Sequence, residues 1–574
     1  MLADDDFLAI FRSHVAEFGD QPALVQLDFP GTDANGLAMT YRELDTAARR
    51  VAAWLVANSV PGERAVLLFP SGCQFVVGFL GCLYARTVAV PAPMLDTGGR
   101  GTIRLAGILA DADAHVVLTD AEHHDAVSAW LTGEDTASAV ACGATDLLAA
   151  GTAEIDLPVL GEQDDIAFLQ YTSGSTSEPK GVMVTHANIA HNQAEIHRAL
   201  GTDRSSHSLG WLPHYHDMGL IGQFLGPLYL GSTCYFMSPM TFLKRPHLWL
   251  KAISDLRIPF SVAPNFAFEL VTRRVTDEQL AGLDLSCLRS VLNGSEPVHA
   301  DTLDAFVTRF ASAGLAPHTP FPCYGMAEVT LFATGSRGGT VVSRRVDVAA
   351  LERNELRPAT EDATGTTLVS SGTAGEIDVR IVDPDTGMAL PDERIGEIWL
   401  RGRSVAAGYW RQPELTSRTF RASTADGEAG FLRTGDLGVL SDGELYVTGR
   451  LKDVLVVNGR NLYPHDIERA VRREHPALAA GAGAVFALGE RDDRLVLVHE
   501  VKKSLADRTE DELVGLLRAA VRAEFDVHLT QVVFVPPGGI AKTTSGKVRR
   551  AAVRQAFLAD RLTRVPLTPA GAVR

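Results

Sequence analysis

The sequence has no hydrophobic run long enough to cross a membrane. Its longest apolar stretch, residues 73–84, contains Gln74 and two glycines, and it is far shorter than the roughly 20 residues of a membrane helix. The first residues, 1–6, are acidic where a secretory signal is basic. We therefore expect neither a membrane span nor a signal peptide.

Cysteine is scarce and scattered. Six cysteines occur in 574 residues, with no Cys-x-x-Cys pair, which argues against a disulfide framework and against a zinc site. Several lie in apolar runs, as buried free thiols do in a reducing compartment. We therefore expect a cytoplasmic protein.

Positive charge is in deficit, and low-complexity tracts are absent. Lys and Arg number 53 against 70 Asp and Glu, which gives a formal net charge of −17. A general nucleic-acid-binding surface needs clustered positive charge, so no nucleic-acid partner is expected. The Gly-x4-Gly-Lys-Ser/Thr spacing of a Walker A loop is also missing.

The most distinctive stretch that is present covers residues 171–186, YTSGSTSEPKGVMVTH, and it follows the apolar run 166–169. Small residues leave the backbone N–H groups free to face an anion, and Lys180 adds a mobile positive charge. An ordinary surface loop has a similar composition. The stretch favours a phosphate cradle, and the rest of the chain has to decide between these two interpretations.

Short apolar runs alternate with helical periodicity over the first 330 residues, in a chain long enough for at least two domains. Predicted strands include 65–69, 88–90, 116–118, 208–212, 234–237, 260–262 and 290–292, and predicted helices include 5–18, 72–85 and one that Thr40 and Glu43 cap. The alternation predicts an α/β protein with parallel sheets covered on both faces and ligands at the carboxyl ends of the strands. After these first 330 residues we predict an irregular stretch, 335–375, and a small β subdomain with strands 376–382 and 396–401.

Several loops after predicted strands carry polar groups. In WLPHYHDMGLIG at 211–222, the His and Asp residues do not match a zinc motif, and a mixed polar and apolar wall beside a substrate fits better. In YGMAE at 324–328, Glu328 fits either a helix N-terminal charge or a Mg²⁺ ligand. NGSEP at 293–297 alone indicates only a turn, and RTGDLG at 433–438 places Asp436 in a tight turn.

Taken in order, these motifs resemble the adenylate-forming superfamily of acyl-CoA synthetases, adenylation domains and luciferases. The matching motifs are YTSGSTSEPKG at 171, NGSEP at 293, YGMAE at 324, RTGDLG at 433, GRLKD at 449 and KTTSGK at 542. Within the superfamily the chain most resembles the fatty acyl-AMP ligases. That resemblance rests on WLPHYHDMGLIG at 211, on GRLKDVLVVNGRNLYPHDIE at 449 and on the long segment after YGMAE.

The resemblance implies a large N-terminal domain, 1–451, with two parallel α/β subdomains and a small β subdomain. A small mobile α+β domain, 452–574, would carry the catalytic lysine. With ATP and Mg²⁺, a medium- or long-chain fatty acid would form an acyl-adenylate and pyrophosphate. The acyl group would then pass to the phosphopantetheine thiol of an acyl carrier protein, or of a carrier domain of a polyketide or nonribosomal peptide synthase.

The resemblance also assigns roles to matching positions. The implied ATP contacts are Thr172, Ser173, Gly174, Ser175, Thr176, Lys180, Ser295, Glu296, Pro297, Tyr324, Gly325, Met326, Asp436 and Arg450. The implied Mg²⁺ ligands are Glu328 and Thr172, the implied catalytic residues are Lys547 and His216, and the implied hinge is Lys452. The acyl pocket would include Met218, Ile221, Asn265 and Phe266, although burial in the core explains the apolar members nearly as well.

Three other functions compete with this one. An acyl-CoA synthetase would use free CoA as the thiol. An amino-acid adenylation module usually holds the α-amine with an aspartate, and the matching residues 260–266 contain none. A non-enzymatic acyl-AMP sensor would not need Glu328 and Lys547.

The thiol acceptor is expected to be a carrier acting in trans, because no Gly-x-Asp-Ser phosphopantetheine site follows. An acidic carrier needs a basic patch on this acidic chain. The candidates are Lys542, Lys547, Arg549, Arg550 and Arg554, with Arg469, Arg472 and Arg473.

Overall fold

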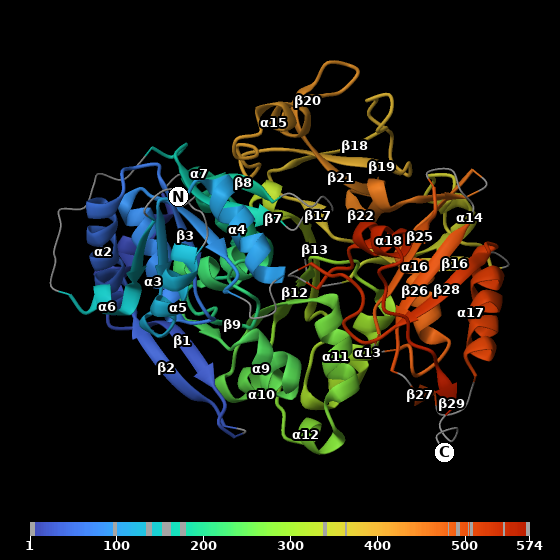
Figure 1. The fold of residues 1–574 in the computed structure, drawn as a ribbon, viewed down its shortest axis with the longest axis horizontal. Helices are drawn as coiled ribbons and strands as arrows, with labels where there is room; N and C mark the ends of the chain where they lie inside the picture. The colour runs from blue at the N-terminus through green and yellow to red at the C-terminus, as the bar shows by residue number, and fades with distance from the viewer. Residues whose placement is uncertain are drawn as a thin grey trace.

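The structure is a computed structural model, shown in Figure 1. It describes residues 6–31, 33–95, 100–133, 140–151, 162–172, 179–336, 341–361, 364–457, 459–479, 481–489, 494–502, 504–505, 509–543 and 546–569. The N-terminal sheet lies at one end of the molecule and the C-terminal segment at the other. No helix in these described ranges is long and apolar enough to cross a membrane.

The first sheet has six strands in the order β6-β5-β3-β4-β7-β8. They are β3 (Arg64–Leu68), β4 (Val88–Ala92), β5 (Val116–Thr119), β6 (Ala141–Ala144), β7 (Ile166–Thr172) and β8 (Lys180–Thr185). Neighbours are parallel except β7 and β8, which form an antiparallel pair. Every residue of β3, β4 and β5 is buried, so this sheet is covered on both faces as predicted.

The helices of this half fit their sequence signals. They are α1 (Phe7–Phe18), α2 (Tyr41–Asn58), α3 (Cys73–Ala85), α4 (Arg100–Ala112), α5 (Ala121–Gly133) and α6 (Thr145–Ala149). Thr40 and Glu43 form the predicted capping box of α2. Helix α2 packs closely on α3 at Gly81, where an added Cβ would lie 2.7 Å from Val51.

The second sheet has nine strands in the order β17-β14-β13-β12-β11-β9-β10-β1-β2. They are β1 (Pro22–Asp28), β2 (Asn35–Thr40), β9 (Ser208–Gly210), β10 (Cys234–Phe236), β11 (Phe260–Pro264), β12 (Ser290–Gly294), β13 (Pro320–Gly325), β14 (Phe332–Gly335) and β17 (Thr373–Ala374). Its helices are α7 (His186–Leu200), η1 (Met218–Leu225), α8 (Gly226–Leu230), α9 (Pro239–Lys244), α10 (His247–Leu256), α11 (Asn265–Arg274), α12 (Asp277–Ala281), α13 (Ala300–Phe310) and η2 (Ala311–Ala313). Because β11, β12 and β13 are parallel and in register through Asn293, their carboxyl ends meet at one edge.

The predicted small β subdomain is antiparallel. It contains β18 (Asp378–Val382), β19 (Gly396–Arg401), β20 (Ala422–Ser423), β21 (Ala429–Ser441), β22 (Glu444–Arg450) and helix α15 (Pro413–Phe420). The expected tight turn at Asp436 is wrong, because this residue lies within β21, opposite Arg450 of β22. Gly435, at φ +71°, supplies the local distortion that the glycine signalled.

The prediction of an irregular stretch over 335–375 is also wrong. It contains the hairpin β15 (Ser343–Asp347) and β16 (Gly365–Val369), with helix α14 (Val348–Leu351) between the strands. Its apolar residues, among them Val346 and Leu351, join Tyr446 of the β subdomain and Tyr463 of the C-terminal segment in one cluster. The two strands are mostly polar and only partly buried, so they show little hydrophobic periodicity in the sequence.

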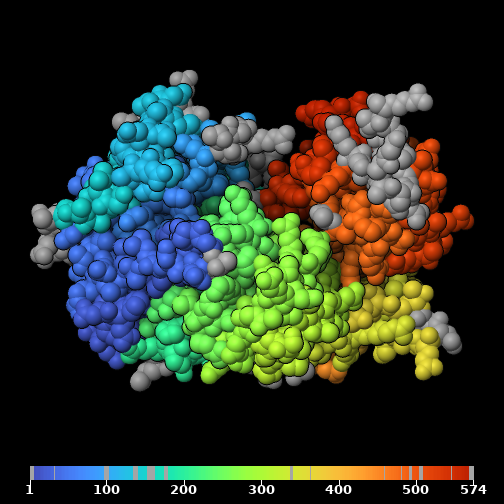
Figure 2. All heavy atoms as spheres, turned by 90° about the horizontal axis from the view of Figure 1, so that it is seen from below, coloured from blue at the N-terminus to red at the C-terminus, as the bar shows by residue number. Residues whose placement is uncertain are grey.

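The C-terminal segment has its own sheet and core. Its strands are β23 (Leu455–Val457), β24 (Arg460–Leu462), β25 (Gly483–Ala487), β26 (Leu495–Glu500), β27 (Ser504–Leu505), β28 (Leu529–Val535) and β29 (Thr568–Pro569), and its helices are η4 (Leu451–Asp453), α16 (Pro464–Arg473), α17 (Glu510–Phe525) and α18 (Arg550–Leu558). Two apolar clusters lie entirely within it. Figure 2 shows it, orange to red, as a body beside the larger part. The predicted fold class, two parallel α/β units, a small β subdomain and a small α+β unit, is confirmed.

Candidate active site

Three loops meet where β11, β12 and β13 end. Asn265 follows β11, Ser295, Glu296 and Pro297 follow β12, and Tyr324 and Gly325 end β13. The main-chain N–H of Phe266 donates to Oε1 of Glu296 at 2.5 Å, which ties two of the loops together. An added Cβ at Gly325 would lie 1.7 Å from the carbonyl oxygen of Leu331, so only glycine fits there.

Tyr324, Asp436 and Arg450 form one hydrogen-bonded group. The Tyr324 hydroxyl donates to Oδ2 of Asp436 at 2.9 Å, and Nε of Arg450 lies 3.2 Å from Oδ1. The charge of Asp436 raises the pKa of Arg450, and burial raises that of Tyr324 well above its usual value. The sulfur of Met326 lies 3.9 Å from the hydroxyl oxygen of Tyr324. This arrangement brings together residues from three of the predicted motifs, YGMAE, RTGDLG and GRLKD.

Glu328 is a buried carboxylate in the short helix η3 (Ala327–Val329). Its Oε1 accepts a hydrogen bond from the Tyr409 hydroxyl at 2.8 Å, and Nζ of Lys180 lies 5.4 Å from the Tyr409 ring. Burial raises the pKa of Glu328, and no ion pair joins it to the described residues. A buried carboxylate without a cationic partner fits a divalent cation as ligand.

The predicted phosphate cradle lies between β7 and β8, and the structure describes only its two ends. Thr172, the last residue of β7, pairs with Lys180, the first residue of β8. Ser173, Gly174, Ser175 and Thr176 lie outside the described residues. Pro179, next to the end of the loop, packs near Gly107 of α4, whose added Cβ would lie 3.6 Å from it.

The loop 211–222 brings a hydrogen-bonded pair of histidine and aspartate to the same region. Nδ1 of His216 lies 2.8 Å from Oδ1 of Asp217, which also accepts the main-chain N–H of Met218 at 2.7 Å and so caps helix η1. Burial opposes ionisation of Asp217, yet its pKa is lowered by His216 and Lys547. The sequence analysis placed Asp217 only in a mixed polar and apolar wall beside a substrate, although an aspartate just before a helix is a familiar N-cap signal.

The predicted acyl wall is apolar and closely packed. Met218 and Ile221 are buried in η1, and Asn265 is buried beside Asn293. The ring of Phe266 lies 5.9 Å from that of Trp211, which stacks on Phe242 at 3.8 Å. These residues therefore adjoin the carboxyl ends of the strands, and their contact with an acyl chain stays a prediction.

Lys547 reaches this site from the C-terminal segment. Burial lowers the pKa of Lys547, as does the charge of Arg450, whereas Asp217, Asp436 and Glu296 act to raise it. The charges of three carboxylates from three different motifs act on this ammonium group, which places Lys547 near them. The structure thus joins KTTSGK to motifs up to 330 residues away in the sequence.

Polar contacts hold the C-terminal segment over the site. Arg469 of α16 pairs with Asp301, and its Nη1 lies 3.3 Å from Nδ1 of His299. The main-chain N–H of Asn461 donates to the Glu352 carbonyl at 3.1 Å. Lys452 lies exposed in η4, at the connection between the two parts.

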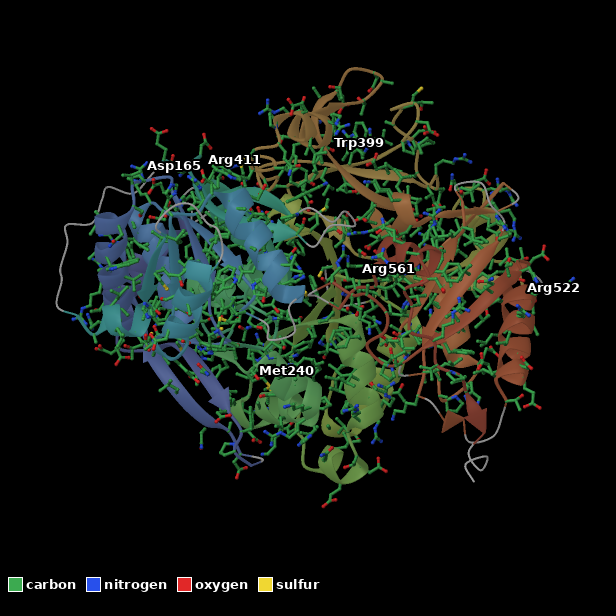
Figure 3. The ribbon with its side chains drawn as sticks, in the orientation of Figure 1. Asp165, Met240, Trp399, Arg411, Arg522 and Arg561 are labelled. Carbon is green, nitrogen blue, oxygen red and sulfur yellow. The ribbon has the colours of Figure 1, made fainter. Side chains whose placement is uncertain are left out.

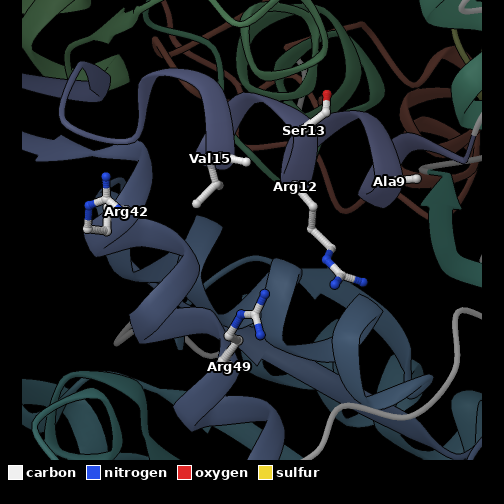
Figure 4. Close-up of a pocket in the computed structure, with 7 residues that line it drawn as sticks. Ala9, Arg12, Ser13, Val15, Arg42 and Arg49 are labelled. Carbon is white, nitrogen blue, oxygen red and sulfur yellow. The ribbon is translucent and has the colours of Figure 1, made fainter.

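A separate cavity of about 440 Å³ lies between α1 and α2 (Figure 4). Arg12 extends toward it from α1, and Arg42 and Arg49 reach it from α2. Arg42 is paired with Asp20 and Arg49 with Asp45. None of the predicted site residues lines this cavity, so it is not part of the candidate active site.

Comparisons with known proteins agree with this geometry. Residues 11–410 match the family model described as AMP-binding enzyme, and residues 452–565 match the Disco-interacting protein 2-like AMP domain. The chain is 40% identical, over 91% of its length and 90% of the relative's, to the medium-chain-fatty-acid–[acyl-carrier-protein] ligase JamA of Moorena producens.

Two solved structures extend the comparison. One, from a study of fatty acyl-adenylate ligases from E. coli and L. pneumophila, has a TM-score of 0.87 and 31% identity and covers 98% of this chain and 99% of that one. The other, a fatty acyl-adenylate ligase from L. pneumophila in complex with acyl adenylate and pyrophosphate, has a TM-score of 0.75 and 34% identity and covers 96% of both chains.

Proposed function

The chain belongs to the family of AMP-binding enzymes, and we propose that it is an ATP-dependent fatty acyl-AMP ligase that loads an acyl carrier protein. It activates a medium- or long-chain fatty acid as the acyl-adenylate and transfers the acyl group to a phosphopantetheine thiol in trans. The observation that carries this proposal is the position of Lys547 among Asp217, Asp436 and Glu296. The name of the Moorena producens relative supports the fatty acid and the carrier.

In the first half-reaction a carboxylate oxygen of the fatty acid bonds to the α-phosphorus of ATP. The bond from that phosphorus to the β-phosphate oxygen breaks, and the electron pair leaves with pyrophosphate. Both reactants are anions, so the transition state needs positive charge nearby. Lys547 supplies it, and His216, held by Asp217 at 2.8 Å, faces the acyl carboxylate.

In the second half-reaction the pantetheine thiolate attacks the acyl carbonyl. The carbonyl bond to the phosphate oxygen breaks, and AMP leaves. Lys547 and the incoming thiol need the same space, so we propose that residues 452–574 rotate about Lys452 between the two steps. The separate apolar clusters of this segment support its movement as one body.

The nucleotide sits at the carboxyl ends of β12 and β13. We assign the adenine to Ser295, Glu296, Pro297 and the Tyr324 ring, beside Gly325 and Met326. We assign the ribose hydroxyls to Asp436 and Arg450, and the β- and γ-phosphates to residues 172–176 and Lys180. The hydrogen bond between Tyr324 and Asp436 orients both residues before ATP arrives.

Mg²⁺ completes the proposed site. Glu328 would bind it together with Thr172, because Glu328 is buried and carries no ionic partner among the described residues. When bound, the ion neutralises charge on the phosphates. The cytoplasmic location expected from the free thiols stays a prediction.

The packing of the 335–375 segment favours a carrier over free CoA as acceptor. Glu352 and Asn354 of this segment contact Asn461, and Nη1 of Arg460 lies 3.5 Å from Oε2 of Glu352. These contacts restrain the C-terminal segment near the hinge. An acceptor can shift the C-terminal segment to its rotated state only by binding that state more tightly. Free CoA can do so through its nucleotide alone, whereas a carrier protein also binds through a protein docking surface.

Product analysis tests the proposed activity. The protein would be incubated with ATP, Mg²⁺ and fatty acids from acetate to long chains, with an amino acid as comparison, and the products identified by mass spectrometry. Acyl-adenylates and pyrophosphate should form with medium or long alkyl chains. An aminoacyl-adenylate, or no adenylate with any acid, would contradict the proposal.

A further inference from the structure

An arginine of the C-terminal segment binds the chain just after β12. Arg469 of α16 forms an ion pair with Asp301, in the first turn of α13, and its Nη1 lies 3.3 Å from Nδ1 of His299. An arginine side chain has only donors, so Nδ1 of His299 accepts this hydrogen bond with its lone pair. Burial, followed by the charge of Arg469, lowers the pKa of His299 to about 3, so the lone pair is available at neutral pH.

His299 connects this contact to the proposed adenine loop. It lies two residues after Pro297, and its main-chain N–H donates to Oδ1 of Asn265 at 3.3 Å. The same Oδ1 accepts from Nδ2 of Asn293 at 3.4 Å. Between these anchors Ser295 has a φ of +72°, a backbone conformation that residues other than glycine rarely adopt. Such a conformation persists only where its surroundings hold it, so the hydrogen bonds on both sides support the loop.

Arg469 reaches across to the larger part of the protein. Arg473, one turn further along α16, instead pairs at 3.0 Å with Glu524 inside the C-terminal segment. Apolar residues of α16 belong to a core cluster of this segment, so α16 moves with the segment if it rotates, whereas α13 stays. The contact between Arg469 and Asp301 therefore belongs to the conformation described here and is lost in the rotated one.

We propose that Arg469 is a positioning residue that stabilises the adenylation conformation by tying the C-terminal segment to the end of the adenine loop, and that its contacts break before thiol transfer. This inference rests on the proposed function. Because one set of contacts supports the loop and holds the segment, a nucleotide that orders the loop favours closure of the segment. Closure favours nucleotide binding by the same factor.

The two half-reactions measure this effect, because each of them uses one of the two conformations. The ratio of the transfer rate to the adenylation rate follows the ratio of the two populations, whatever its starting value. Arg469→Gln should raise that ratio about three- to tenfold, as expected for a hydrogen-bonded ion pair with one exposed partner. Single-turnover pyrophosphate release reports adenylation. Transfer is measured from isolated acyl-adenylate at saturating holo carrier, so the affinity for the carrier does not enter.

Further variants separate positioning from a general loss of structure. Asp301→Asn should raise the ratio as well, and the double variant should raise it by less than the product of the two single factors, since both remove one contact. Arg469→Lys keeps the charge and should fall between the wild type and Arg469→Gln. Arg309→Gln is the matched control, because Arg309 of α13 pairs with Asp277 at 2.6 Å inside the larger part, and its ratio should stay unchanged.

Distances between spin labels test the contact without a fatty acid and so separate it from the proposed function. Labels on Met240→Cys of α9 and Arg522→Cys of α17 occupy exposed positions on the two parts (Figure 3), and the unsubstituted protein reports labelling of the native cysteines. The population at the distance of the described conformation should shrink in Arg469→Gln and persist in Arg309→Gln. Mg²⁺ with α,β-methylene-ATP should enlarge it by a greater factor in the wild type than in Arg469→Gln.

An unchanged ratio of rates together with unchanged label distances in Arg469→Gln would overturn the inference. A defect limited to the affinity for the carrier would also overturn it and would place Arg469 in a carrier-docking surface instead. If the wild type adenylates no fatty acid but the label distances shift as expected, the proposed function fails and the contact between the two parts stands.

Discussion

Lys547→Ala removes the ammonium group that lies among Asp217, Asp436 and Glu296. Negative charge grows at the α-phosphate in the transition state, so this cation acts more strongly there than on bound ATP. Losing one such contact should lower the adenylation rate on the order of 10²–10³-fold, about 3–4 kcal/mol. ATP binding should change little, because Tyr324, Asp436 and Arg450 keep their mutual contacts.

The assay is single-turnover release of pyrophosphate, with the Kd of ATP measured in parallel. Lys547→Arg is the matched control, since it keeps a positive charge on a side chain of similar length. Near-normal pyrophosphate release by Lys547→Ala would refute the role of this lysine. A large loss of ATP affinity would place its effect on the ground state instead.

The pH dependence gives the same reasoning a second check. Burial, followed by the charge of Arg450, lowers the pKa of Lys547 below its usual 10.5. Only the protonated ammonium carries charge, so activity is present below this pKa and is lost as pH rises through it. The alkaline limb of kcat/KM, which reports the free enzyme, should lie below pH 10.5. In Lys547→Arg that limb should move upward, because arginine stays protonated beyond about pH 12.

Lys452→Pro should impair at least one half-reaction, because proline fixes φ where the domain has to rotate; wild-type rates of both adenylation and thiol transfer would place the hinge elsewhere. Glu328→Gln should raise the Mg²⁺ concentration needed for half-maximal pyrophosphate release, and an unaltered Mg²⁺ titration would exclude Glu328 as a ligand. Catalytic efficiency should climb with acyl length by about fourfold per methylene, since each buried methylene contributes roughly 0.8 kcal/mol, until the pocket is full; a flat profile from acetate upward would contradict an apolar pocket beside Met218 and Ile221.

The sequence was sufficient for the parts of the fold that rest on strong periodicity. The fully buried strands β3, β4 and β5 fall within one or two residues of their predicted bounds, because continuous apolar runs between turn residues indicate parallel strands. The hairpin of β15 and β16 was missed, since its residues are mostly polar and only partly buried. The sequence also failed to place Asp436 within strand β21, because the glycines and the aspartate of RTGDLG are typical of a turn.

The candidate site also has a part that sequence motifs predict and a part that only the folded structure shows. Motifs identified the residues that meet at the strand ends. For Asp217 the sequence analysis foresaw a place in the polar wall of its loop, but neither its role as the cap of η1 nor its interaction with Lys547 from the C-terminal segment. The basic patch predicted for an acyl carrier protein stays a prediction, although several of its members have partners inside the C-terminal segment. Arg550, Arg554 and Lys542 look alike in sequence, but their side chains are engaged within their own domain.

The choice of thiol acceptor tests the central claim most directly. The intact protein, ATP, Mg²⁺ and a fatty acid that it adenylates would be supplied with equal concentrations of free CoA and a phosphopantetheinylated acyl carrier protein, and both thioesters would be quantified by mass spectrometry. We predict acyl carrier protein with no acyl-CoA, and a rate of transfer that falls as salt is added. Efficient formation of acyl-CoA would contradict the account and make the protein an acyl-CoA synthetase.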